Sequence, residues 1–157
     1  MKIAVTVNGT REEWDVAPAE TLLDALRDHG YRGAKRVCES GECGACAVIV
    51  DGLAIDACIR LAVQSDGSQI TTVEGLETAD GLHPVQEAFT ANGAIQCGFC
   101  IPGMVVTAAN YLEMNPQPTE DDIRHVFIGN LCRCTGYKKP VEAVLASVSE
   151  EVGRRED

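Results

Sequence analysis

The chain is poor in aromatic residues and in basic residues. Phe, Trp and Tyr make up 4% of its 157 residues, so any core must be built mainly from aliphatic side chains. Lys and Arg number 13 against 24 Asp and Glu, and no basic run interrupts this balance. The sequence therefore does not predict nucleic-acid binding. The formal net charge of -11 is typical of a soluble surface.

Long apolar runs and targeting signals are also missing. No apolar stretch approaches the roughly 20 residues that span a bilayer. The segment from Met1 to Val7 is a short alternating stretch without the apolar core and cleavage site of a secretory signal. We expect no membrane span and a cytoplasmic location, although a partner with an export signal could carry the chain elsewhere.

Sequence patterns of substrate chemistry are absent as well. There is no Ser-His-Asp set, no phosphate-binding G-x-x-x-x-G-K, no dinucleotide fingerprint and no carboxylate pair placed for acid–base work. We therefore expect no catalytic residues and no substrate site on this chain.

Cysteine is the residue that carries the chemistry of this sequence, since eight cysteines form two groups with none left over. The first group is spaced C-x4-C-x2-C with one more cysteine after a short hairpin, which is the plant-type spacing for a [2Fe-2S] cluster; it comprises Cys38, Cys43, Cys46 and Cys58. The second group consists of two close pairs that could each grip one side of a metal centre; it comprises Cys97, Cys100, Cys132 and Cys134.

Three other interpretations of these cysteines are less favoured. A disulfide scaffold would normally have a secretory signal and a higher cysteine density. Structural zinc also uses four thiolates, but C-x4-C lies at the edge of its usual spacing, and a loop with Gly41 and Gly44 suits a larger core. A thioredoxin-like C-x-x-C needs a βαβ context and leaves the other cysteines unexplained. The histidines, none of which forms a Rieske pattern, are interpreted as surface or helix-end residues: His29, His83 and His125.

The first half of the chain is predicted to form a small mixed sheet crossed by one helix. Asn8-Gly9 and Asp51-Gly52 each favour a tight turn between two strands. Thr21 can cap a helix that ends at Gly30. The strands are expected at 2–7, 11–16, 47–50, 53–57 and 69–73. This order predicts a β-grasp arrangement.

The second half shows helical periodicity. Helices are expected at 84–91, 102–114, 119–127 and 140–152. Pro102 and Pro140 suit first-turn positions, and Thr119 can act as a cap. The predicted fold class is α+β, with a β-grasp ferredoxin domain at 1–75 and an all-α four-helix domain at 76–157. A hinge is expected between Glu74 and Leu82.

Three segments together resemble the small iron–sulfur subunit of molybdenum hydroxylases, the xanthine dehydrogenase, aldehyde oxidoreductase and carbon monoxide dehydrogenase family. They read CESGECGAC at 38–46, QCGFCIPG at 96–103 and GNLCRCTGY at 129–137. The chain departs from the family pattern at Val37, where Gly is common, and at Ala47, where Thr is frequent. Neither departure removes a cysteine.

The resemblance implies two [2Fe-2S] clusters, one per domain, and an electron-transfer role. It implies partners: a large molybdopterin subunit and a medium FAD subunit, expected as a dimer of heterotrimers. Gln96 and Cys134 would lie near the pterin, and the loop at Gly41 and Glu42 near the flavin. Electrons would pass from molybdenum to the Cys97 cluster, the Cys38 cluster and then the flavin, and some family members run this path backward. The alternative is a free-standing, diffusible ferredoxin.

Overall fold

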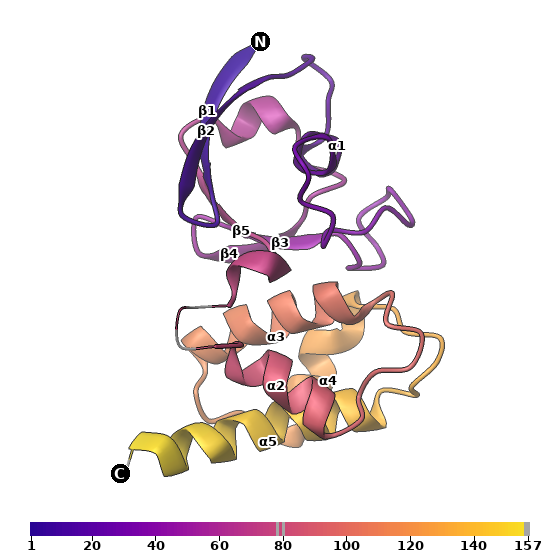
Figure 1. Cartoon of the computed structure of the whole chain (residues 1–157). Helices are drawn as coiled ribbons and strands as arrows, with labels where there is room; N and C mark the ends of the chain where they lie inside the picture. The colour runs from indigo at the N-terminus through magenta and orange to yellow at the C-terminus, as the bar shows by residue number, and fades with distance from the viewer. Residues whose placement is uncertain (78, 80, 156–157) are drawn as a thin grey trace.

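The computed structural model describes residues 1–77, 79 and 81–155, with side chains placed up to residue 148 apart from 78 and 80. In this part of the chain a sheet with one helix occupies the N-terminal half, and further helices occupy the C-terminal half (Figure 1). The strands are β1 (Lys2–Val7), β2 (Thr10–Asp15), β3 (Ala47–Val50), β4 (Leu53–Asp56) and β5 (Gln69–Thr71). The α-helices are α1 (Leu22–Asp28), α2 (Pro84–Ala91), α3 (Ile101–Met114), α4 (Glu120–Val126) and α5 (Lys138–Arg155). Short 3₁₀ helices are η1 (Ala62–Ser65), η2 (Val73–Gly75) and η3 (Phe127–Gly129).

The five strands form one mixed sheet in the order β2-β1-β5-β3-β4. Only the central pair, β1 with β5, is parallel, and the other pairs are antiparallel. Both hairpin turns have two residues with positive φ, Asn8 and Gly9 in the first and Asp51 and Gly52 in the second. That is the geometry of a type I′ turn, so both predicted hairpins are confirmed.

Helix α1 covers one face of this sheet. Its N-cap is Thr21, whose hydroxyl accepts a hydrogen bond from the Asp24 N–H at 3.1 Å. Leu22, Leu23 and Leu26 are fully buried in the core that the helix shares with the sheet. The α+β fold of the N-terminal half therefore follows from one amphipathic helix that packs on one apolar sheet face.

Helices α2 to α5 form the second half, close to the four predicted spans. Pro102 lies in the first turn of α3, and Thr119 caps α4 with a reciprocal bond to Asp122. The core between these helices contains Phe89, Met104 and Phe127, all almost fully buried. The predicted α+β fold class, with a sheet-based part followed by a helical part, is confirmed.

Strand β3 is buried on both faces and joins the two halves. Val48 and Val50 face the α1 side, whereas Ala47 and Ile49 pack in the core of the helical half. Helix α3 lies against this second face of the sheet (Figure 1). The run Ala-Val-Ile-Val is therefore apolar throughout because neither face of the strand contacts water.

Several element ends differ from the prediction by one to three residues, and one predicted feature lies partly outside the described residues. The strand expected at 69–73 ends at Thr71, because the Asn8 side chain bonds to the Thr72 N–H and hydroxyl, each at 2.9 Å, in place of a ladder partner. The helix expected to reach 127 ends at Val126 and tightens into η3. The hinge expected at 74–82 includes residues 78 and 80, which lie outside the described residues. The domain boundary at 75/76 stays a prediction.

Among the described helices none is both long enough and apolar enough to cross a membrane.

Candidate metal centres

The first cysteine set lies on a loop between α1 and β3 and at the end of β4. Cys43, Cys46 and Cys58 are buried, and Cys38 is half-buried. The loop turns sharply at Glu39, Gly41 and Gly44, which all have positive φ. This loop carries three cysteines within nine residues, and the β3–β4 hairpin returns the fourth, Cys58, beside Cys46.

The thiols of the first set are arranged in two pairs. Cys38 interacts with Cys43, and Cys46 with Cys58. Hydrogen bonds from the backbone N–H groups of Ser40 and Glu42 lower the pKa of Cys38 to about 6, and the Ser40 N–H lies 3.4 Å from its sulfur. Burial raises the pKa of Cys46. A thiolate at Cys38 is thus favoured by the loop itself, whereas buried Cys46 requires a bound cation to become a ligand.

The second set lies on two loops at one end of the helical half. Cys97 and Cys100 precede α3, and Cys100 is the N-cap of that helix. Cys132 and Cys134 lie between η3 and α5. The second loop is held by Tyr137, whose hydroxyl donates to the Asn130 carbonyl at 3.0 Å and accepts from the Cys132 N–H at 2.9 Å.

These four thiols form a closed ring of interactions. Cys100 interacts with Cys132 and Cys97, and Cys134 interacts with Cys97 and Cys132. Burial, with the neighbouring Cys132, raises the pKa of Cys100 to about 12. Burial also acts to raise the pKa of Cys132, but hydrogen bonds from Thr135, the Cys134 N–H and the Cys100 thiol together lower that pKa. The second set therefore offers four neighbouring thiols, with raised pKa values at Cys100 and Cys134 and a lowered one at Cys132.

The pairing of the cysteines in each set fits a [2Fe-2S] cluster. Among the described residues, no group of three or more His, Cys, Asp or Glu side chains is placed to hold a single metal ion. A [2Fe-2S] core is larger and takes four cysteine thiolates, two at each iron. The pairwise contacts in both sets match that need.

The two ligand loops touch each other directly. The Leu131 N–H, next to Cys132, donates to the carbonyl oxygen of Cys43 at 2.9 Å. The buried Asn130 side chain donates to the Gly44 carbonyl at 3.3 Å. Gly103, in the first turn of α3, lies so close that a methyl group there would overlap the Gly44 carbonyl oxygen. The first set is therefore bonded to the backbone that carries the second.

This close contact makes Gly103 sensitive to a single added carbon. We expect Gly103→Ala to lower the free energy of unfolding by about 1 to 3 kcal/mol, because overpacking here must push the cysteine loop away from α3. Gly129→Ala is the matched control, since a Cβ there meets nothing within 4 Å. Thermal unfolding of both variants, monitored by the loss of cluster absorbance, checks this prediction. Equal stability of the two variants would contradict it.

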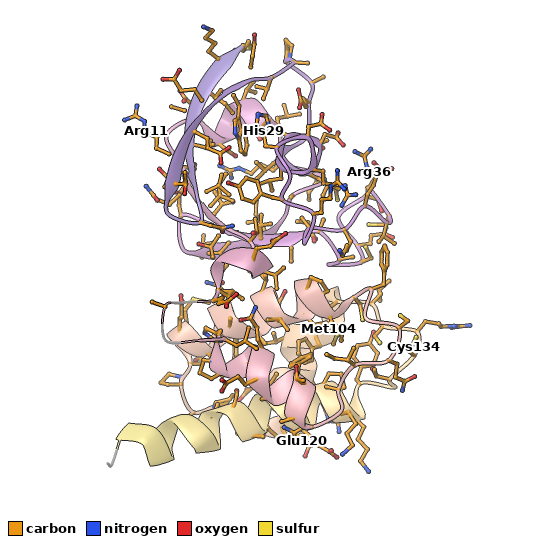
Figure 2. All side chains as sticks on the ribbon, viewed as in Figure 1. Arg11, His29, Arg36, Met104, Glu120 and Cys134 are labelled. Atoms are coloured by element: carbon orange, nitrogen blue, oxygen red, sulfur yellow. The ribbon has the colours of Figure 1, made fainter. Side chains whose placement is uncertain are left out.

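The other predicted site residues lie on these loops, next to the cysteines. Gln96 is exposed beside Cys97, and Glu42 is exposed beside Cys43. Cys134 is exposed, and it lies at the same edge of the molecule as Arg36, just before the first loop (Figure 2). Asn130, Thr135 and Tyr137 support the site but were not predicted to do so from the sequence. The only sequence signal for them is their position in the GNLCRCTGY segment.

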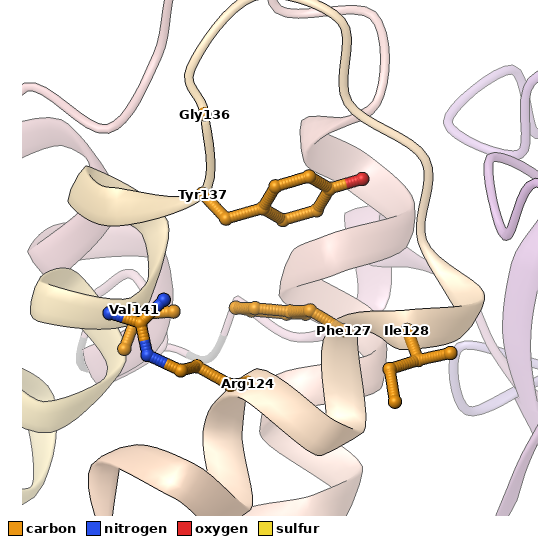
Figure 3. Close-up of a pocket in the computed structure, with 6 residues that line it drawn as sticks. All are labelled: Arg124, Phe127, Ile128, Gly136, Tyr137 and Val141. Carbon is orange, nitrogen blue, oxygen red and sulfur yellow. The ribbon is translucent and has the colours of Figure 1, made fainter.

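A cavity of about 420 Å³ adjoins the second loop. In Figure 3 the Tyr137 ring lies on one side of it and Phe127 on the other, with Arg124 and Val141 at one end. Arg124 is paired with Glu120. The lining is apolar apart from this arginine and the Tyr137 hydroxyl, which is bonded to the loop. The cavity contains no nucleophile or acid–base pair among its lining residues.

Comparison with known proteins gives two family matches, which overlap at residues 72–79. Residues 5–79 match the 2Fe-2S iron–sulfur cluster binding domain, and residues 72–145 match the [2Fe-2S] binding domain. The nicotine 6-hydroxylase small subunit of Paenarthrobacter nicotinovorans is 50% identical over 147 residues, which cover 92% of this chain and 88% of that protein. The chain belongs to the family of small [2Fe-2S] subunits of molybdenum hydroxylases.

Two further relatives agree with this membership. The xanthine dehydrogenase iron–sulfur-binding subunit of Escherichia coli O157:H7 is 43% identical over 145 residues, covering 91% of each chain. The structure of quinoline 2-oxidoreductase from Pseudomonas putida 86 matches with a TM-score of 0.92 and 44% identity, covering 99% of this chain and 96% of that one.

Membership in the molybdenum hydroxylase family decides between the two predicted roles. The chain is an electron-transfer subunit of an oxidoreductase complex with larger partner subunits, and it carries two [2Fe-2S] clusters. The alternative of a free-standing ferredoxin is not supported, because the named relatives are subunits of such complexes.

Proposed function

We propose that the two cysteine sets hold the two clusters and form a relay between the redox centres of the partner subunits. Cys38, Cys43, Cys46 and Cys58 would hold one cluster, and Cys97, Cys100, Cys132 and Cys134 the other. Electrons from a molybdopterin centre would reach the Cys97 cluster first and the Cys38 cluster second, and then pass to a flavin. A bound cluster supplies one-electron redox chemistry, so the relay splits a two-electron oxidation into single steps.

The observation that carries this proposal is the hydrogen bond from the Leu131 N–H to the Cys43 carbonyl. Leu131 is covalently joined to Cys132 of the second set, and Cys43 belongs to the first. A continuous path of covalent bonds and one 2.9 Å hydrogen bond therefore links a sulfur of one set to a sulfur of the other. Asn130 and Gly103 hold the two loops in this contact.

The distribution of exposed apolar side chains supports a subunit that is covered in the complex. Most large exposed apolar side chains lie within a few residues of a cysteine of either set. They are Val37, Ile59 and Leu61 near the first set, and Ile95, Phe99, Ile128 and Leu131 near the second. A diffusible carrier needs one small exposed edge, whereas apolar surface round both centres is typical of a permanent interface.

The finer arrangement is also part of the proposal. Gln96 and Cys134 would contact the pterin of the large subunit, which fits their exposure at the outer edge of the second set. Gly41 and Glu42 would face the flavin of a medium subunit. The three subunits would assemble as a dimer of heterotrimers, and the chain would divide into domains 1–75 and 76–157. Thiolate-ligated clusters suit a reducing compartment, so we place the complex in the cytoplasm.

Composition analysis of the complex, purified through a tag on this chain, tests the proposal. We expect two irons and two acid-labile sulfides per cluster, two clusters per chain, and no thiol that titrates without unfolding, because eight thiolates satisfy two cores. Molybdenum, pterin and flavin should co-purify in equal amounts. Nicotine, xanthine and quinoline, the compounds in the relatives' names, can be offered as electron donors. Zinc in place of iron, or a chain that purifies alone with both clusters, would contradict the proposal.

A further inference from the structure

One carboxylate lies against a cysteine of the first set. Asp56 is the last residue of β4 and pairs with Ala47, next to Cys46. The Cys46 Sγ donates to its Oδ1 at 3.5 Å. The half-buried carboxylate and the sulfur therefore interact electrostatically at contact distance.

The described residues place no cation within ion-pair distance of Asp56. Its side chain lines a cavity of about 180 Å³ between the sheet and the helices, whose other lining residues are uncharged: Gly44, Ala47, Ala54, Ile55, Thr107, Val126, Gly129 and Asn130. The nearest arginine in sequence, Arg60, donates instead to the Ser65 hydroxyl and the Gln64 carbonyl, both at 2.9 Å. Within the described part of the chain Asp56 joins no ion pair.

Cluster binding changes what this contact does. A ligating cysteine has lost its thiol proton, so Cys46 no longer donates and two negative groups face each other. One added electron makes the ligand set more negative still, and a nearby carboxylate opposes that change. Among the described residues no counter-cation lies within ion-pair distance of Asp56 to offset this opposition.

We propose that Asp56 lowers the reduction potential of the Cys38–Cys58 cluster and so sets the driving force for electron exchange between the two clusters. This inference rests on the ligand sets proposed above. A lower potential at this centre makes its reduced form a stronger donor to the acceptor beyond it. Asp56 acts through Cys46 and is a tuning residue, with no contact to substrate.

Redox titration of the intact complex with dithionite, monitored by paramagnetic resonance, tests this inference. In Asp56→Asn the constant for one-electron reduction of the first cluster should rise by roughly tenfold, which corresponds to about 59 mV for a one-electron couple. The second cluster, read in the same sample, should keep its potential. Glu13→Gln is the matched control, since it removes an equal charge from an exposed position on β2, the opposite edge of the sheet.

Two more variants separate charge from shape. Asp56→Glu keeps the charge, so its first cluster should have the wild-type reduction potential. Asp56→Ser removes the charge, so its first cluster should show the same raised potential as Asp56→Asn. Potentials that do not group by charge, a shift shared by both clusters, or an equal shift in Glu13→Gln would overturn the inference. So would failure of both neutral variants to assemble the first cluster, because Asp56 would then build the site. Failure of the proposed ligand sets looks different: two separate cluster signals would not be found at all.

Discussion

In a Cys43→Ser variant of the complex we expect the paramagnetic signal of one [2Fe-2S] cluster to disappear while the other signal remains. The first set loses one of its four sulfurs, and a serine oxygen is a poor replacement for a thiolate at iron. Serine keeps the backbone carbonyl that accepts from the Leu131 N–H, so the contact between the loops is preserved. Low-temperature resonance of the reduced protein, with iron analysis, measures the loss.

The reciprocal variant is the control for this prediction. Cys100→Ser should remove the second signal and leave the first, because Cys100 lies at the start of α3, where it interacts with Cys132 and Cys97. The two cores are distinct clusters of buried residues that meet at β3, so one site can fail while the other half stays folded. Loss of both signals from either variant, in a protein that remains folded, would mean that the sets are interleaved.

Substrate added to the Cys43→Ser complex should reduce molybdenum and the remaining cluster, while flavin reduction and turnover fall to background. Only the second set has exposed cysteines, Cys97 and Cys134, at an edge that a pterin could reach. The first set would be the sole link from there to the flavin. Rapid-freeze resonance combined with flavin absorbance resolves the order of reduction within one turnover.

The Cys100→Ser complex again provides the comparison for this electron route. With the second cluster gone, substrate should reduce molybdenum but leave the first cluster oxidised, even though dithionite can still reduce that cluster. Prompt flavin reduction by substrate in the Cys43→Ser complex would contradict the proposed order, since electrons would then bypass the ferredoxin half.

Local sequence signals were sufficient for most of the secondary structure. Asn8-Gly9 and Asp51-Gly52 form the two hairpins because few other dipeptides accept two successive positive φ angles. Thr21 and Thr119 cap the helices predicted from them, because a hydroxyl there satisfies an otherwise free N–H group. These rules act over three or four residues and need no knowledge of the rest of the chain.

Features that depend on distant contacts were not predictable in the same way. Strand β5, which begins at Gln69, ends two residues before its predicted end because Asn8, far away in sequence, bonds to Thr72. Asn130 gave no sign of holding the ligand loops, since its partner, the Gly44 carbonyl, is a backbone group that only the fold brings near. In the sequence Asp56 is one residue of a predicted strand, and only the folded hairpin places it against Cys46.

The spacing of the first four cysteines by itself predicted the class of cofactor, because three thiolates on a nine-residue loop suit few other metal centres. The grouping of the eight cysteines along the chain predicted two ligand sets. The same residues could not say how the two sets are related in space. That was decided by β3, whose second face packs on α3 and brings the carbonyl of Cys43 to the N–H of Leu131. Spacing along a chain constrains only local geometry, whereas the distance between two sites depends on which apolar faces exclude water together.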